Sequence, residues 1–282
     1  MSDQPLPDPH ATIAAQSYRK SRGLWRVLAF IALAVAIIVG LGRFAWPDRP
    51  GSDYVARLVI DGTIATDRDR LDAIEQLAED ETVKAVIVAI NSPGGTTAGT
   101  MELAADIAAA GAAKPCYGFI EDMGASAAYW ALSQTKKLYA NAGAMTASIG
   151  TISIVYDTSK AFDLAGIKTH VVSTGPMKGA FADGTEITKE QLAYYQGIID
   201  EINSFFISGV AKGRGMSQAA VRELADGSVM MASKAQKAGL IDEVSTLDNV
   251  ISDLRRKGKS AAKANKSAAA RMRAKIDLEE AR

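Results

Sequence analysis

Residues 83–95 read VKAVIVAINSPGG, and this stretch decides the fold class. Its first eight residues are an almost continuous apolar run, which is typical of a strand buried on both faces of a parallel sheet. The run stops at Asn91-Ser92-Pro93-Gly94-Gly95, because proline and paired glycines interrupt a strand. A helix is expected from about Thr97 to Ala110. A strand, a turn and a helix in this order predict one unit of an α/β domain.

The sequence on either side of this unit repeats the alternation. Upstream, Val55–Ile60 has the composition of a strand, and Asp67–Glu79 has apolar residues at helical spacing. Downstream we expect a helix at 125–134, a long amphipathic helix after Thr188, and strands at 116–121, 137–140, 150–156 and 168–173. The whole pattern predicts an α/β domain with crossover connections.

Composition and charge exclude several classes of protein. With 48% hydrophobic and 23% charged residues, the 282-residue chain is not disordered as a whole. Its 32 basic residues balance 32 acidic ones, so we expect no nucleic-acid partner. Cys116 is the single cysteine, and His10 and His170 are the two histidines. We therefore expect neither a disulfide framework nor a metal site, and no cofactor is implied.

The N-terminal part predicts a membrane anchor. The uncharged run VLAFIALAVAIIVGLG at residues 27–42 follows four basic residues between 19 and 26 and is flanked by tryptophans. This charge distribution predicts a cytoplasmic N-terminus and an exported domain on a bacterial cytoplasmic membrane. A cleaved signal peptide is the alternative, although FAWP at 44–47 is a poor cleavage site. The expected segments are a leader (1–23), an anchor (24–46), a linker (47–53), a catalytic domain (54–250) and a basic Ala/Lys-rich tail (251–282).

Two of the turns after strands have the composition of a catalytic site. Gly94 and Gly95 follow a buried strand, at the sheet edge where α/β proteins bind ligands, and their N–H groups are candidates for an oxyanion hole. Ser126, within Gly124-Ala125-Ser126-Ala127-Ala128, is expected at the start of a helix. It is either a nucleophile or a helix N-cap, which is the commonest role of serine in that place.

A nucleophilic serine needs a base. His170 lies in an expected strand only 44 residues after Ser126, which does not fit the late histidine of an α/β-hydrolase. The alternative is Lys178, in GPMKGAF at 175–181, with Met177 and Phe181 as apolar neighbours. A lysine accepts a proton only when desolvation lowers its pKa from about 10.4 toward neutrality. A solvated surface lysine is the simpler interpretation.

Four segments of the chain resemble, in their sequence and order, motifs of the signal peptide peptidase A family. Members of this family are membrane-anchored serine proteases with a ClpP/crotonase-like fold of repeated ββα-type units. The resemblance covers about Tyr54 to Val244. Its motifs are NSPGG at 91–95, GASAAYW at 124–130, TASIG at 146–150, and GPMKG at 175–179 followed by TKE at 188–190. Small alanines replace common family glycines at 127, 128 and 147.

The resemblance implies a mechanism and partners. Ser126 would be the nucleophile, Lys178 the general base, and Ser148 the hydroxyl that orients the lysine. The substrates would be hydrophobic peptides such as cleaved signal peptides. Because the chain has half the length of double-domain members, a homo-oligomeric ring is implied, with serine and lysine meeting across an interface as one arrangement. The alternatives are an inactive membrane-tethered scaffold, an acyl-CoA enzyme of the crotonase fold, and an esterase that uses Ser126 and His170.

Overall fold

The computed structural model describes residues 30–33 and 54–257. The chain divides into two units, 1–51 and 52–282, and the second contains all the described residues except 30–33. The expected leader, linker and most of the tail lie outside the described residues, as does most of the expected anchor. Within the described ranges, no helix is both long enough and apolar enough to cross a membrane.

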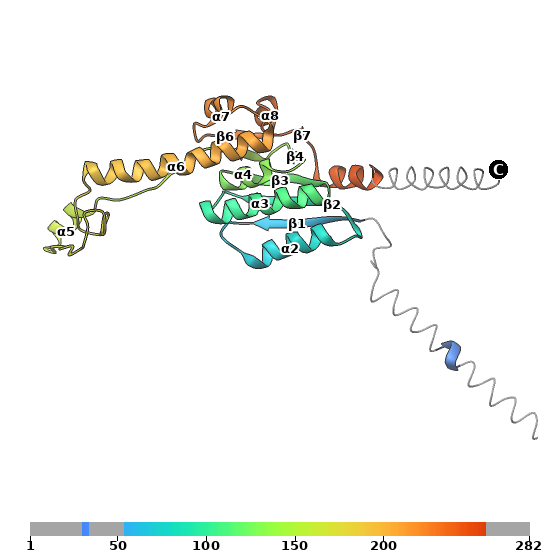
Figure 1. The fold of residues 1–282 in the computed structure, drawn as a ribbon, viewed down its shortest axis with the longest axis horizontal. Helices are drawn as coiled ribbons and strands as arrows, with labels where there is room; N and C mark the ends of the chain where they lie inside the picture. Colours follow the sequence, from blue (N-terminus) through green and yellow to red (C-terminus); the bar gives the residue numbers. More distant parts are fainter. Residues whose placement is uncertain (1–29, 34–53, 258–282) are drawn as a thin grey trace, which may run out of the picture. The chain divides into compact units, whose positions relative to one another are not determined.

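A mixed sheet forms the centre of the domain (Figure 1). Its parallel part has the order β1-β2-β3-β4-β7. The bounds of these strands are β1 (Tyr54–Asp61), β2 (Val83–Ser92), β3 (Cys116–Ala125), β4 (Lys137–Ala140) and β7 (Glu243–Val244). The C-terminal part of β3 continues beyond β4 and pairs with β5 (Met145–Ala147), which pairs antiparallel with β6 (Val229–Met231). The predicted α/β class is confirmed.

The helices that follow the strands begin at capping residues that the sequence supplies. Asp67 caps α2 (Arg68–Glu79), and Thr96 caps α3 (Thr97–Ala113). Thr188 and Gln191 form a capping box for the long α6 (Lys189–Arg214). The other helices are α4 (Ala127–Ser133), α5 (Ser159–Leu164), α7 (Gln218–Leu224), α8 (Ala232–Lys237) and a C-terminal helix at 247–257.

The core lies on both faces of the sheet. Successive residues of β2 point to opposite faces, so Val86, Val88 and Ile90 pack against α2 and α3, whereas Ile87 faces the other side. That second face is covered by Val250 and Leu254 of the C-terminal helix. The burial of β2 on both faces explains its continuous apolar run.

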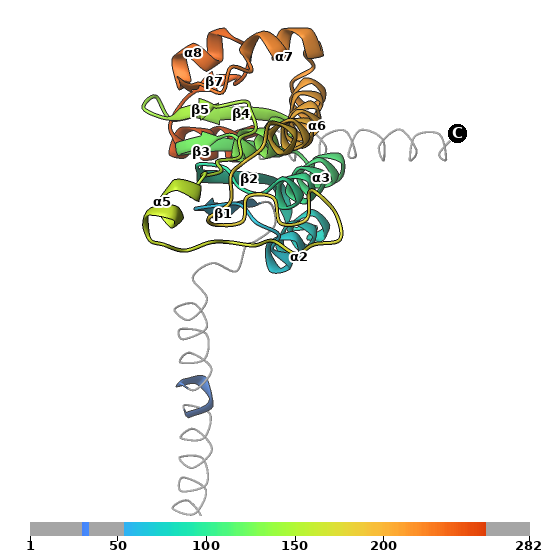
Figure 2. The same cartoon turned by 90° about the vertical axis from the view of Figure 1, so that its left-hand side faces the viewer.

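The predicted strands at 150–156 and 168–173 are wrong. Neither segment pairs with the sheet, because β6 occupies the free edge of β5. Residues 150–188 instead form an arm with α5, and the arm lies at the N-terminal end of α6 (Figures 1 and 2). The apolar side chains Ile152, Ile154 and Tyr156 of the first segment are exposed.

Two glycines let the C-terminal half of α6 approach α4 closely. A Cβ added at Gly209 would lie 2.0 Å from Trp130 Nε1, and one at Gly213 would lie 2.3 Å from the Ser133 carbonyl oxygen. Trp130 also stacks on Phe206, with ring centroids 5.3 Å apart. This packing fixes α4, and with it Ser126, against one end of α6.

Candidate active site

Ser126 sits at the junction of β3 and α4 in a strained backbone conformation. Its φ of 54° and ψ of −125° are unusual for a residue with a side chain and cost roughly 1–3 kcal/mol. The Ser126 N–H donates to the Ala147 carbonyl at 2.8 Å, which holds the turn in place. The Ser126 side chain makes no capping hydrogen bond. Ser126 therefore occupies the N-cap position of α4 without capping the helix through its side chain, and its hydroxyl is left available.

The NSPGG turn lies directly beside Ser126, as the sheet topology requires. A Cβ added at Gly94 would lie 2.9 Å from Ser126 Cβ, so only glycine fits there. The Gly94 N–H already donates to Ser92 Oγ at 3.1 Å. The Gly95 N–H and the Ala127 N–H, the first of α4, have no partner within the described part of the chain. Gly95 and Ala127, rather than the expected Gly94–Gly95 pair, therefore have N–H groups free to donate to a ligand.

Ser148 lies on the neighbouring strand end, next to Ser126. Ala147 and Ser148 both have positive φ, 67° and 51°. The Ser148 N–H donates to the Ser228 carbonyl at 2.9 Å, and its hydroxyl donates to the Gly227 carbonyl at 3.1 Å. The Ser148 hydroxyl uses its proton in this bond. Its oxygen lone pairs can therefore accept a hydrogen bond from a donor in the cavity.

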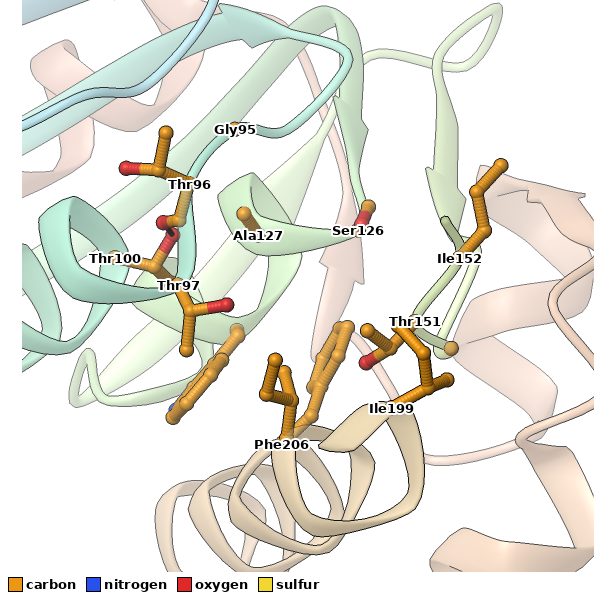
Figure 3. A pocket seen from close by; sticks show the side chains of 13 residues that line it. Gly95, Thr96, Thr97, Thr100, Ser126, Ala127, Thr151, Ile152, Ile199 and Phe206 are labelled. Atoms are coloured by element: carbon orange, nitrogen blue, oxygen red, sulfur yellow. Dashed lines mark hydrogen bonds between the residues drawn. The ribbon is translucent and has the colours of Figure 1, made fainter. Parts of the chain in front are cut away.

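Two cavities meet at Ser126. The first cavity, of about 360 Å³, lies between the NSPGG turn and α6. Trp130 and Phe206 line it. Figure 3 shows Ser126 on one wall of this cavity and Thr151, Ile152 and Ile199 across from it. The second cavity, of about 380 Å³, contains Ser126 and Ser148 together. The structure therefore brings together four of the five predicted site residues, with Gly94 in contact with Ser126 rather than in a cavity wall.

α6 contributes residues to both cavities that the sequence analysis missed. Ile199, Ile202 and Phe206 line the first cavity, whereas Gln196, Asp200 and Asn203 line the second. The spacing of three or four residues places each set on one stripe of the helix. The amphipathic pattern after Thr188 was the available signal, but it gave no indication of which stripe faces the serines.

The second cavity is rich in hydrogen-bond acceptors. Asp200 and Asp226 line it, and hydrogen bonds from Ser228 hold the pKa of Asp226 below its usual range. Asn203 Oδ1 is buried without a hydrogen-bond partner in the described part of the chain. Among the described residues that line this cavity, none is basic. The arrangement suits a cation, since an ammonium group supplies three donors and no acceptor.

Lys178 and His170 both lie in the arm, and neither lines a cavity that contains Ser126. Both side chains are exposed. The arm itself is held together by local contacts, such as the T-shaped pair of Phe181 and Tyr195 with centroids 4.4 Å apart. Among the residues that the structure describes, neither of the two cavities at Ser126 is therefore lined by a lysine or a histidine.

Comparison with known proteins gives the family. Residues 108–261, more than half of the chain, match the model of peptidase family S49. The chain belongs to peptidase family S49. The resemblance to the signal peptide peptidase A family is thereby confirmed: a protein of Enterococcus faecium named as a candidate SppA is 27% identical over 190 residues, 67% of this chain and 55% of the relative.

Further relatives differ in how much of their own length this chain matches. Protein slr0021 of Synechocystis, named as a candidate protease, is 28% identical over 71% of this chain and 73% of its own length. Protease 4 of Haemophilus influenzae is 28% identical over 75% of this chain but only 35% of the relative. A solved structure of a membrane-bound stomatin-specific protease is 15% identical, with a TM-score of 0.47 over 71% of this chain and 84% of the other.

Proposed function

We propose that this S49 chain is a membrane-anchored serine endopeptidase with a Ser126–Lys178 dyad, and that the lysine of one copy serves the serine of another. The observation that carries the proposal is Ser126 itself, a strained residue with a free hydroxyl between two cavities. A conformation that costs free energy persists at a turn when the surrounding structure imposes it, and such residues cluster at active sites.

The proposed reaction has two halves. The Lys178 amine takes the proton of Ser126 Oγ as that oxygen attacks the peptide carbonyl, and the developing oxyanion accepts from the Gly95 and Ala127 N–H groups. The tetrahedral intermediate breaks the C–N bond, and the leaving amine takes the proton from the lysine. Water then attacks the acyl-enzyme, with the lysine again as base, which releases the carboxylate product and restores Ser126.

The second cavity supports a lysine from another copy. It offers Ser148 Oγ, the Asp200 and Asp226 carboxylates and the Asn203 amide, with no basic group among its described residues. Lys178 stands on an arm with unusually exposed apolar side chains: Leu164 is 90% and Val172 is 98% exposed. A single chain rarely leaves such side chains in water, so their exposure favours a partner that covers them. A ring of identical subunits satisfies both features.

The substrate proposal is a hydrophobic peptide, including residual signal peptides. Trp130, Ile199, Ile202 and Phe206 give the first cavity apolar walls beside the nucleophile. The expected anchor at 24–46 would hold the domain at the exported face of the cytoplasmic membrane, where such peptides are left after secretion. Peptides with Leu, Ala or Phe around the cut should be hydrolysed, and those with Asp or Lys there should not.

The test combines an active-site probe with peptide cleavage. The full-length protein should react with a fluorophosphonate probe and cleave apolar peptides, and the Ser126→Ala variant should do neither. Ser233→Ala, an exposed serine on α8, is the matched control and should behave as the wild type. Absence of labelling and cleavage in the wild type would instead support the inactive scaffold. Cleavage confined to peptides with acidic or basic residues would refute the substrate proposal alone.

A further inference from the structure

A hollow between α2 and α3 lies outside the site described above. It encloses about 440 Å³ and has an apolar floor that includes Leu71, Ile74 and several alanines of α3. Its rim carries four carboxylates, Asp72, Glu75, Glu79 and Asp106, and no basic residue lines it. We call this hollow the α2–α3 groove.

Within the described part of the chain, none of the four carboxylates of the groove forms an ion pair. Burial, together with the nearby Glu102, raises the pKa of Asp106 above its usual value. Arg70 pairs with Asp67, and Lys114 donates to the Asp80 and Val83 carbonyls, so these partners of the two basic side chains lie outside the groove. A cationic, apolar occupant would cover the floor and relieve this repulsion.

The chain itself contains a segment of that chemistry. Residues 259–275 carry six basic side chains and no acidic one, interspersed with alanines. The basic residues are Lys259, Lys263, Lys266, Arg271, Arg273 and Lys275. We propose that residues 266–275, which carry four of these basic side chains and no acidic one, dock in the α2–α3 groove of their own chain, with alanines on the floor and lysines and arginines against the carboxylate rim.

Length and charge favour this occupant over others. The C-terminal helix covers the opposite face of the sheet from α2 and α3, so the segment must pass around the sheet. The eight residues 258–265 that follow Lys257 reach up to about 26 Å when extended, which exceeds the radius of a domain whose radius of gyration is about 17 Å. Lys259 and Lys263 lie in this connecting part, so Lys266, Arg271, Arg273 and Lys275 are the basic residues available to the rim. A symmetric contact between the grooves of two copies would place carboxylates against carboxylates, which is unfavourable. An anionic membrane surface would be repelled by the same carboxylates.

Cross-linking of the full-length protein in detergent tests the proposal. The one native cysteine, Cys116, is buried and leaves a clean background. A short bismaleimide should join Ala109→Cys in the groove to Ala268→Cys in the segment, and mass spectrometry should locate the bond. The matched control replaces Ala109→Cys by Ala219→Cys, an exposed position on α7. Mixing isotope-labelled and unlabelled protein distinguishes bonds within a chain from bonds between chains.

The expected yield at Ala109→Cys is about tenfold that at Ala219→Cys, and it should fall about fivefold at high salt, since screening weakens exposed charge pairs. The triple variant Asp72→Asn/Glu75→Gln/Glu79→Gln should lower it similarly while the circular dichroism spectrum stays unchanged. Equal yields at the two positions, no response to salt or neutralisation, or bonds only between chains would overturn the proposal. None of these outcomes depends on peptidase activity, so the proposed function stands or falls separately.

Discussion

The end of β3 and the arm at 150–188 differ in almost every physical respect. Around Ser126, the backbone is strained, Ala125 and Ala127 are buried, and the Ser126 N–H donates to the Ala147 carbonyl at the end of β5. In the arm, local contacts hold the chain together, and apolar side chains face outward. Ser126 is thus held in a defined position by the sheet, whereas Lys178 stands on an exposed arm away from it. Under the proposed function, assembly completes the active site.

The largest expected effect concerns the base. Lys178→Ala should lower peptide cleavage by about 10³-fold or more, and the double variant with Ser126→Ala should be little worse than either single variant, because nucleophile and base act as a unit. Lys160→Ala, another exposed lysine of the arm, is the control and should keep its activity. Steady-state cleavage of an apolar peptide measures the effect. Additive losses in the double variant would mean that Lys178 is not the base.

The second prediction separates assembly from folding. Leu164→Asp/Val172→Asp places charges on the most exposed apolar part of the arm. We expect loss of the oligomer and a fall in activity of roughly 10- to 100-fold, while the unfolding free energy changes by less than about 0.5 kcal/mol. Light scattering and denaturant unfolding measure the two quantities. Met101→Asp on α3, also exposed and apolar, should leave the oligomer intact; an unchanged oligomer in the arm variant would contradict the account.

A third prediction tests the rigid half of the comparison. Gly209→Ala would push a methyl group into Trp130 and should destabilise the domain by about 1–3 kcal/mol. Gly197→Ala lies on the same helix, where an added Cβ meets open space, and should stabilise it by up to about 1 kcal/mol. Urea unfolding of both variants gives the comparison. Equal effects would show that α4 and α6 are not in close contact.

The sequence predicted the sheet-bound half far better than the arm. Apolar runs and turns located β2, β3 and β4, and sheet geometry then places Gly94 and Ser126 together because both follow neighbouring parallel strands. The strand predicted at 150–156 does not form, because the local sequence does not show whether a neighbouring strand is free to pair with it. The positions of Asp200 and Asn203 in the second cavity depend on how α6 is rotated against α4. Close packing at Gly209 and Gly213 fixes that rotation, and no local sequence pattern reveals it.

The fourth prediction is smaller and concerns pH. Asp242 accepts from the Leu138 N–H at 2.7 Å and from Arg214 Nη1 at 2.9 Å. Burial opposes its charged form, but these bonds hold the pKa of Asp242 below its usual value. The stabilisation is therefore present above the unfolded-state pKa of about 3.9 and is lost as the pH falls below it.

Asp242→Asn should lower the free energy of unfolding by about 1–3 kcal/mol at pH 7, because it leaves the Arg214 guanidinium without its carboxylate partner. The difference from the wild type should shrink at acid pH, where Asp242 becomes protonated. Thermal unfolding at several pH values measures this, with Asp248→Asn, an exposed aspartate for comparison, as the control. A penalty that did not change with pH would argue against a role for the ionised carboxylate.

Complementation tests the central claim most directly. Ser126→Ala and Lys178→Ala proteins, each inactive alone, are dissociated, mixed in equal amounts and reassembled. If the lysine of one copy serves the serine of another, about a quarter of the interfaces in a randomly mixed ring join two intact residues, and a corresponding fraction of the wild-type cleavage rate should return. A mixture as inactive as its two components, with mixed oligomers demonstrated by mass, would show that the two residues of the dyad belong to one chain.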